Sequence, residues 1–126
     1  MYKILVDTDI LIDFSKGKDS QLMSLFELQT KGRVELYVCP VNITEFLSDL
    51  FLSNSGKIKL ATNFLEKFKV LKIGKKTGIL AGQILRTKQT SYIGDALIGA
   101  VCIENEVELL TRNKKHFEKI TGLKLN

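Results

Sequence analysis

Residues 3–14 read KILVDTDILIDF, an apolar run that becomes polar at Asp7. An unbroken run such as the ILV at residues 4–6 is typical of a strand covered on both faces, as in a parallel sheet. Thr8 and Asp9 are residue types that cap helix N-termini, so we expect a short helix to start at one of them. Asp7 then lies at the carboxyl end of a buried strand, where ligands bind in open α/β sheets.

The rest of the chain continues this alternation of strands and helices. Further strands are predicted at residues 34–39, 70–73 and 108–110, and the alternating helices at residues 22–31, 42–52, 58–68, 76–88 and 92–107. Asp19 or Ser20 would cap the second helix, Asn42 or Thr44 would start the third, and a helical turn and a final edge strand would end the chain. This order predicts an α/β fold with a mostly parallel central sheet and helices on both faces.

Composition indicates one globular domain over residues 1–126, with 26% charged and 44% hydrophobic residues. No apolar run approaches the ~20 residues that span a bilayer, so no membrane contact and a cytoplasmic location are expected. Cys39 and Cys102 stand alone in apolar segments and are interpreted as buried reduced thiols. The net charge of +5 would suit a polyanionic ligand whose phosphates meet lysines while a metal ion bridges it to acids.

Acidic and polar residues follow the predicted strand ends. Asp7 and Asp9 follow the first strand and Glu45 the second, Asp95 lies in the first turn of an apolar helix, and Thr111 and Asn113 follow the fourth strand. Each acid also has a simpler interpretation. Asp7 or Asp9 can cap a helix, Glu45 can favour a helix dipole, and Asp95 can be a buried cap.

If these side chains converge, their chemistry points to a particular kind of cation. Carboxylate and amide oxygens without histidine or cysteine suit Mg²⁺ or Mn²⁺, and such ions assist phosphodiester hydrolysis. Without a cation, the four acids would repel one another, and the pKa of at least one of them would rise.

Three segments together resemble PIN-domain ribonucleases, of the kind that form the toxin of VapBC toxin-antitoxin pairs. They are ILVDTDILIDF at residues 4–14, VNITEF at 41–46 and GDALIGAVCIENEVELLTRNKKHF at 94–117. The resemblance covers essentially the whole chain and implies a three-layer α/β/α fold. It also implies a metal-dependent endoribonuclease acting on RNA, the toxin of a type II toxin-antitoxin system, with a small antitoxin partner and a homodimer.

The resemblance also assigns roles to residues. Asp7 and Asp95 would hold the metal, and Glu45 would position or deprotonate the attacking water. Asn113 stands where many members have a fourth acid, and its amide oxygen is an uncharged ligand. Asp9 stands where the family usually has Ser or Asn, and Thr111 matches a hydroxyl position near the metal.

Several basic residues could contact the RNA backbone, namely Lys88, Arg112 and Lys114. His116 is expected to pack or to hydrogen-bond locally.

Two other functions fit parts of the pattern. The DTDIL segment at residues 7–11 approaches the nucleophile loop of haloacid-dehalogenase-type phosphatases, in which Asp7 would accept a phosphoryl group. The acid expected shortly after Asp95 is absent there, and the chain is short for that fold. A catalytically inactive PIN-like binding module is the second alternative, supported only by Asn113.

Overall fold

The computed structural model describes residues 1–18, 21–49 and 55–126. Its centre is a sheet of four parallel strands in the order β3-β2-β1-β4. The strands are β1 (Tyr2–Val6), β2 (Val34–Val38), β3 (Lys69–Val70) and β4 (Glu108–Leu110). The predicted parallel sheet is therefore confirmed.

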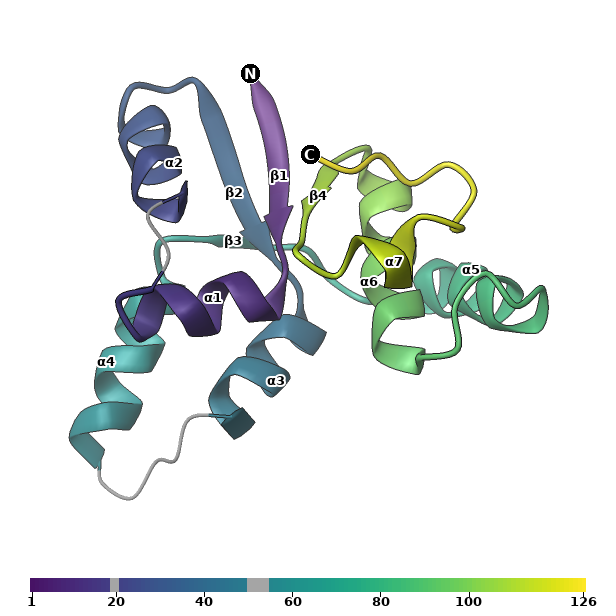
Figure 1. The fold of residues 1–126 in the computed structure, drawn as a ribbon, viewed down its shortest axis with the longest axis horizontal. Helices are drawn as coiled ribbons and strands as arrows, with labels where there is room; N and C mark the ends of the chain where they lie inside the picture. Colours follow the sequence, from purple (N-terminus) through teal and green to yellow (C-terminus); the bar gives the residue numbers. More distant parts are fainter. Residues whose placement is uncertain (19–20, 50–54) are drawn as a thin grey trace.

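Helices cover both faces of this sheet (Figure 1). One face is covered by α1 (Thr8–Ser15), α2 (Gln21–Thr30), α3 (Pro40–Asp49) and α4 (Ser55–Leu65). The other is covered by α5 (Lys75–Arg86), α6 (Ile93–Asn105) and α7 (Lys114–Phe117). This is the three-layer α/β/α arrangement that the sequence predicts.

The strand β1 divides the core in two because its side chains alternate between the faces. Ile4 and Val6 pack with the helices α1 to α4, whereas Leu5 packs with α5, α6 and α7. All three side chains are at most 2% exposed. Burial on both faces explains why the run at residues 4–6 contains no polar residue.

The first helix begins where the sequence indicates, and the third begins earlier. The helix α1 starts at Thr8, and its N-cap is Asp7, as in the simpler interpretation of that residue. The Asp7 carboxylate accepts a hydrogen bond from the Thr8 amide at 2.8 Å. The helix α3 begins at Pro40, because proline fits the first turn of a helix, where the backbone N–H has no partner. Glu45 therefore lies in the second turn of α3, and its interpretation as a first-turn residue favouring the helix dipole is wrong.

The C-terminal segment is less regular than predicted. The helical turn is present as α7, but the final edge strand is reduced to a single parallel bridge between Leu125 and Leu109. The predicted cap at Asp19 or Ser20, and the end of the third helix beyond residue 49, lie outside the described residues.

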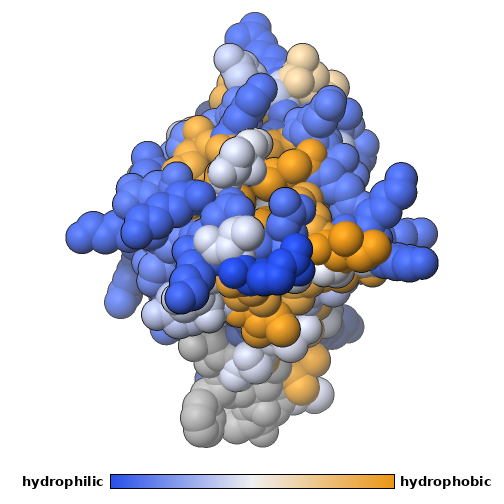
Figure 2. Space-filling view, turned by 90° about the vertical axis from the view of Figure 1, so that its right-hand side faces the viewer, coloured by the Kyte–Doolittle hydropathy of each residue, from blue (hydrophilic) through white to orange (hydrophobic). Residues whose placement is uncertain are grey.

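Two surface features bear on the expectations. None of the helices in the described ranges has the length and hydrophobicity that crossing a membrane requires. Figure 2 shows the end of the molecule formed by α5, α6 and α7, where hydrophobic side chains gather among hydrophilic ones. Ile79 of α5 and Ile93 of α6 are exposed large hydrophobic residues.

Candidate active site

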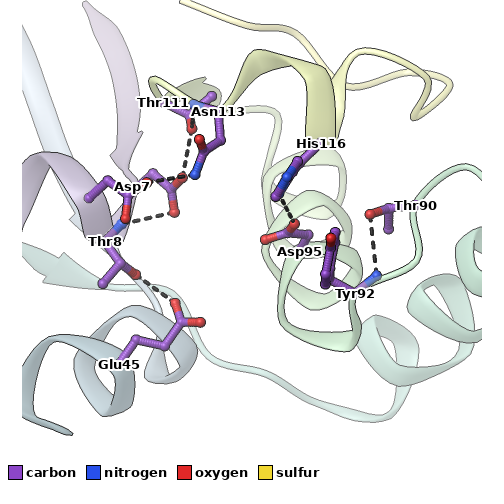
Figure 3. Close-up of polar contacts among 10 residues, drawn as sticks. Asp7, Thr8, Glu45, Thr90, Tyr92, Asp95, Thr111, Asn113 and His116 are labelled. Atoms are coloured by element: carbon purple, nitrogen blue, oxygen red, sulfur yellow. Dashed lines mark hydrogen bonds and ion pairs between the residues drawn. The ribbon is translucent and has the colours of Figure 1, made fainter. Parts of the chain in front are cut away.

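A cleft of about 820 Å³ opens at the carboxyl ends of β1 and β4. The chain continues from β1 to β2 on one side and reaches β4 on the other, so this is the position where the strand order reverses. The four acids predicted from the sequence line the cleft, as do Asn113 and His116 (Figure 3). The lining acids are Asp7, Asp9, Glu45 and Asp95.

Asp7 is the most buried of these acids, with 5% of its surface exposed. The pairing of Val6 with Leu110 brings the ends of β1 and β4 level, and the Asp7 amide donates to the Leu110 carbonyl at 2.9 Å. Burial raises the pKa of Asp7 to about 6, while hydrogen bonds from Thr111 and Thr8 act in the opposite direction. The negative charges of Asp9 and Asp95 raise the pKa further.

The loop after β4 contributes two residues to the wall of the cleft beside Asp7. The Thr111 hydroxyl donates to Asp7 Oδ2 at 2.6 Å and accepts the Asn113 amide at 3.0 Å. The side-chain amide of Asn113 donates to Asp9 Oδ2, also at 2.6 Å. Asn113 thus lies next to Asp9 in the lining of the cleft.

Glu45 is held by a chain of hydrogen bonds that the sequence did not reveal. The Thr8 hydroxyl donates to Glu45 Oε1 at 2.7 Å and accepts the side-chain amide of Asn42 at 3.2 Å. The carbonyl oxygen of the fully buried Asn42 side chain accepts the backbone N–H of Cys39 at 3.0 Å. The end of β2 therefore orients Glu45 through two polar side chains.

Asp95 lies in the first turn of α6, as predicted, and its Oδ2 is 3.0 Å from His116 Nδ1. Partial burial raises the pKa of Asp95, whereas the hydrogen bond and the charge of His116 lower it, and Glu45 and Asp9 raise it. The His116 ring also stacks on Tyr92, with ring centroids 4.7 Å apart. His116 therefore packs, as expected, but its hydrogen-bond partner Asp95 is 21 positions away in the sequence and not local, because α7 packs against α6.

The remaining candidates divide into two groups. Arg112 forms an ion pair with Asp13 of α1, so the structure gives this guanidinium a partner within the protein. For Lys88 and Lys114, contact with the RNA backbone stays a prediction. Both cysteines are buried free thiols, as expected, and burial raises the pKa of each.

Four carboxylates and the Asn113 amide line the cleft together with His116 and several hydroxyl groups, and the carboxylate oxygens suit a hard divalent cation. In the arrangement that the structure shows, no three histidine, cysteine or acidic side chains of the described residues stand close enough together to hold an ion. The acids face one another across the cleft in Figure 3.

The parallel sheet and the acidic cleft at its carboxyl edge define the class of protein. The chain belongs to the PIN domain family, whose model matches residues 4–123. Among proteins of known function, it is similar to Ribonuclease VapC1 of Rickettsia felis. The two are 30% identical over 131 residues, which cover 97% of this chain and 93% of the relative.

Solved structures share the fold at lower identity. VapBC from Salmonella typhimurium bound to DNA contains a chain that matches with a TM-score of 0.83 and 20% identity, covering 100% of this chain and 98% of that one. VapBC2 from Rickettsia felis, bound to a DNA fragment from the promoter, gives a TM-score of 0.82 at 19% identity, covering 98% and 97%. Because the PIN domain model matches almost the whole chain, the interpretation of residues 7–11 as the nucleophile loop of a haloacid-dehalogenase-type phosphatase is wrong.

Proposed function

We propose that this protein is an endoribonuclease that hydrolyses RNA phosphodiester bonds and is the toxin of a type II toxin-antitoxin system. The observation that carries the proposal is the convergence of four carboxylates in one cleft at the edge between β1 and β4. The similarity to Ribonuclease VapC1 supports RNA as the substrate. Three of the acids, Asp7, Glu45 and Asp95, occupy the positions to which the resemblance assigns catalytic roles.

A divalent cation, Mg²⁺ or Mn²⁺, is part of this proposal. Asp7 and Asp95 would hold it, and the raised pKa of Asp7 fits a buried carboxyl group that lacks a positive partner in the described residues. When bound, such an ion lowers the pKa of a water molecule and neutralises negative charge on the reacting phosphate.

The protein side chains have separate tasks in the hydrolysis. Glu45 accepts a proton from the attacking water, and the hydrogen bond from Thr8 fixes the direction in which its carboxylate faces. Thr111 holds Asp7 in one orientation at the floor of the cleft. The water oxygen attacks phosphorus, and the bond from phosphorus to the leaving oxygen of the ribose breaks.

The proposed partners follow from the relatives. Structures similar to this chain are VapBC complexes, so a small antitoxin protein is the proposed partner. A homodimer stays a prediction. Ile79 of α5 and Ile93 of α6 are exposed hydrophobic residues, and size measurement by sedimentation would test for a homodimer.

The test of the function is cleavage of a single-stranded RNA by the purified protein in Mg²⁺ or Mn²⁺ and in excess EDTA. Asp7→Asn and Asp95→Asn should abolish cleavage while circular dichroism and melting show an intact fold. Glu118→Gln, which changes an exposed acid outside the cleft, is the matched control and should cleave normally. Undiminished cleavage in EDTA would refute the metal dependence, and full activity of both cleft variants would refute the site.

A further inference from the structure

Tyr92 is an aromatic residue of the cleft that the roles assigned above do not use. It immediately precedes α6, lines the same cleft as Asp95, and remains 55% exposed. One face of its ring lies on His116, with the two ring planes 20° apart (Figure 3).

The position of this ring is fixed from two sides. The Tyr92 backbone N–H donates to the Thr90 hydroxyl at 3.4 Å, and its carbonyl accepts the Ala96 amide at 3.0 Å as α6 begins. The Tyr92 ring stacks on His116, whose Nδ1 is in turn 3.0 Å from Asp95 Oδ2. The stacked pair therefore stands at a set place relative to a proposed metal-holding carboxylate.

A largely exposed aromatic ring, held in place beside the proposed phosphodiester site, suits a particular ligand group. Every nucleobase has a flat face that stacks on aromatic side chains, and unpaired RNA bases are commonly recognised in this way. Tyrosine has few rotatable bonds, so ordering it on binding costs little conformational entropy. A base stacked on Tyr92 would hold the adjoining phosphate near Asp95.

We propose that Tyr92, backed by His116, is a stacking platform for one unpaired base of the RNA substrate next to the cleaved bond. This inference rests on the proposed function and adds to it a residue that contacts and positions the substrate. It predicts that single-stranded RNA binds better than the same sequence in a duplex, because a paired base cannot reach the ring.

The first experiment measures steady-state cleavage of a short single-stranded RNA by Tyr92→Leu, Tyr92→Phe and the unaltered protein. Loss of the ring should raise KM on the order of tenfold, because stacking contributes substantially to binding per base, and should change kcat less. Tyr92→Phe keeps the ring and should restore KM. Tyr2→Leu, an exposed tyrosine at the opposite end of β1, is the matched control and should leave KM unchanged.

The second experiment uses the absence of tryptophan from the chain. Tyr92→Trp places the single tryptophan of the variant at the platform, and titration with the same RNA should quench its fluorescence, whereas the tryptophan fluorescence of Tyr2→Trp should not change. This titration is done in EDTA, so it reports stacking even if no cleavage occurs. RNA binding without quenching at residue 92, or an unchanged KM for Tyr92→Leu, would overturn the platform.

The outcomes separate this inference from the function on which it rests. If the unaltered protein binds RNA and quenches Tyr92→Trp but cuts nothing, the platform stands and the nuclease proposal fails. If it cuts RNA and Tyr92→Leu has the same KM, the nuclease stands and the platform fails. A change of oligomeric state in Tyr92→Leu with no change in KM would show that the ring contacts a second copy, which also overturns the platform.

Discussion

The Thr111 hydroxyl donates a 2.6 Å hydrogen bond to Asp7 Oδ2, although the two residues are 104 positions apart in the sequence. The parallel pairing of β1 with β4 causes this contact, because it places the first residue after each strand side by side. Asp7 is buried, so the hydroxyl is one of the few groups that stabilise its ionised form. The orientation and the pKa of Asp7 therefore both depend on Thr111.

Thr111→Val should destabilise the protein and raise the pKa of Asp7 further. A hydrogen bond to a charged group contributes about 1.5–3 kcal/mol, so a loss of roughly 2 kcal/mol is expected in urea unfolding at pH 8. Thr77→Val is the matched control, because the buried Thr77 also donates to a carboxylate, that of Glu104. The control should lose stability without altering the titration of Asp7, and an unaltered titration in Thr111→Val would contradict the prediction.

The raised pKa of Asp7 predicts a pH dependence of stability in EDTA. The folded protein holds the Asp7 proton more tightly than the unfolded chain, whose pKa is near 3.8. The contribution of Asp7 to the free energy of unfolding therefore falls as pH rises from about 4 to about 6, by on the order of 3 kcal/mol, and is level above that.

Comparing the unaltered protein with Asp7→Asn isolates this contribution, since the other acids are common to both. The difference in free energy of unfolding between them should change over that pH range, in favour of the variant at high pH. Parallel curves would show that Asp7 has an ordinary pKa.

The sequence predicts a raised pKa for at least one acid, and the pKa values of Asp7 and Asp95 are raised. Burial is a larger cause of the rise than repulsion between the acids.

Thr8→Val should lower the rate of cleavage by freeing Glu45. The hydroxyl of Thr8 is the link between Asn42 and the Glu45 carboxylate, and valine has the same shape without that link. We expect kcat to fall by roughly 10- to 100-fold with little change in KM, since positioning of a general base is lost. Thr44→Val is the control, because the Thr44 hydroxyl donates to the Pro40 carbonyl of its own helix. Equal rates for both variants would count against the role of Thr8.

Asn113→Asp should tighten the binding of Mn²⁺ while destabilising the metal-free protein. The change replaces a donor to Asp9 with a like charge at the same place, and a bound cation would compensate for it. Asn126→Asp makes the same replacement beside Glu108, outside the cleft, and should leave metal affinity unaltered. Calorimetric titration compares the two, and equal affinities would place Asn113 outside the region that the metal influences.

The strands and the meeting of the acids were predictable, because both depend on patterns local to the sequence. The apolar run at residues 4–6 ends at Asp7, and the run at 108–110 ends before Thr111. The carboxyl ends of parallel strands lie at one edge of the sheet, so the sequence alone predicts that these residues lie close together.

The contacts that orient the acids were not predictable in the same way. Asn42 is completely buried in the first turn of α3, where its side chain accepts the N–H of Cys39 just before the helix and donates to Thr8. The contact of His116 with Asp95 depends on the packing of α7 against α6. A contact between side chains of two different helices leaves no periodic pattern in the sequence.

The pairing of β1 with β4 also has a consequence for synthesis of the protein. Asp7 is among the first described residues to leave the ribosome, but Thr111 and Asn113 are added more than a hundred residues later. Until β4 has emerged and docked beside β1, the nascent chain lacks one wall of the cleft and the hydrogen bond that orients its buried acid. The proposed catalytic centre is therefore incomplete until the segment that contains Thr111 and Asn113 has been synthesised and has folded.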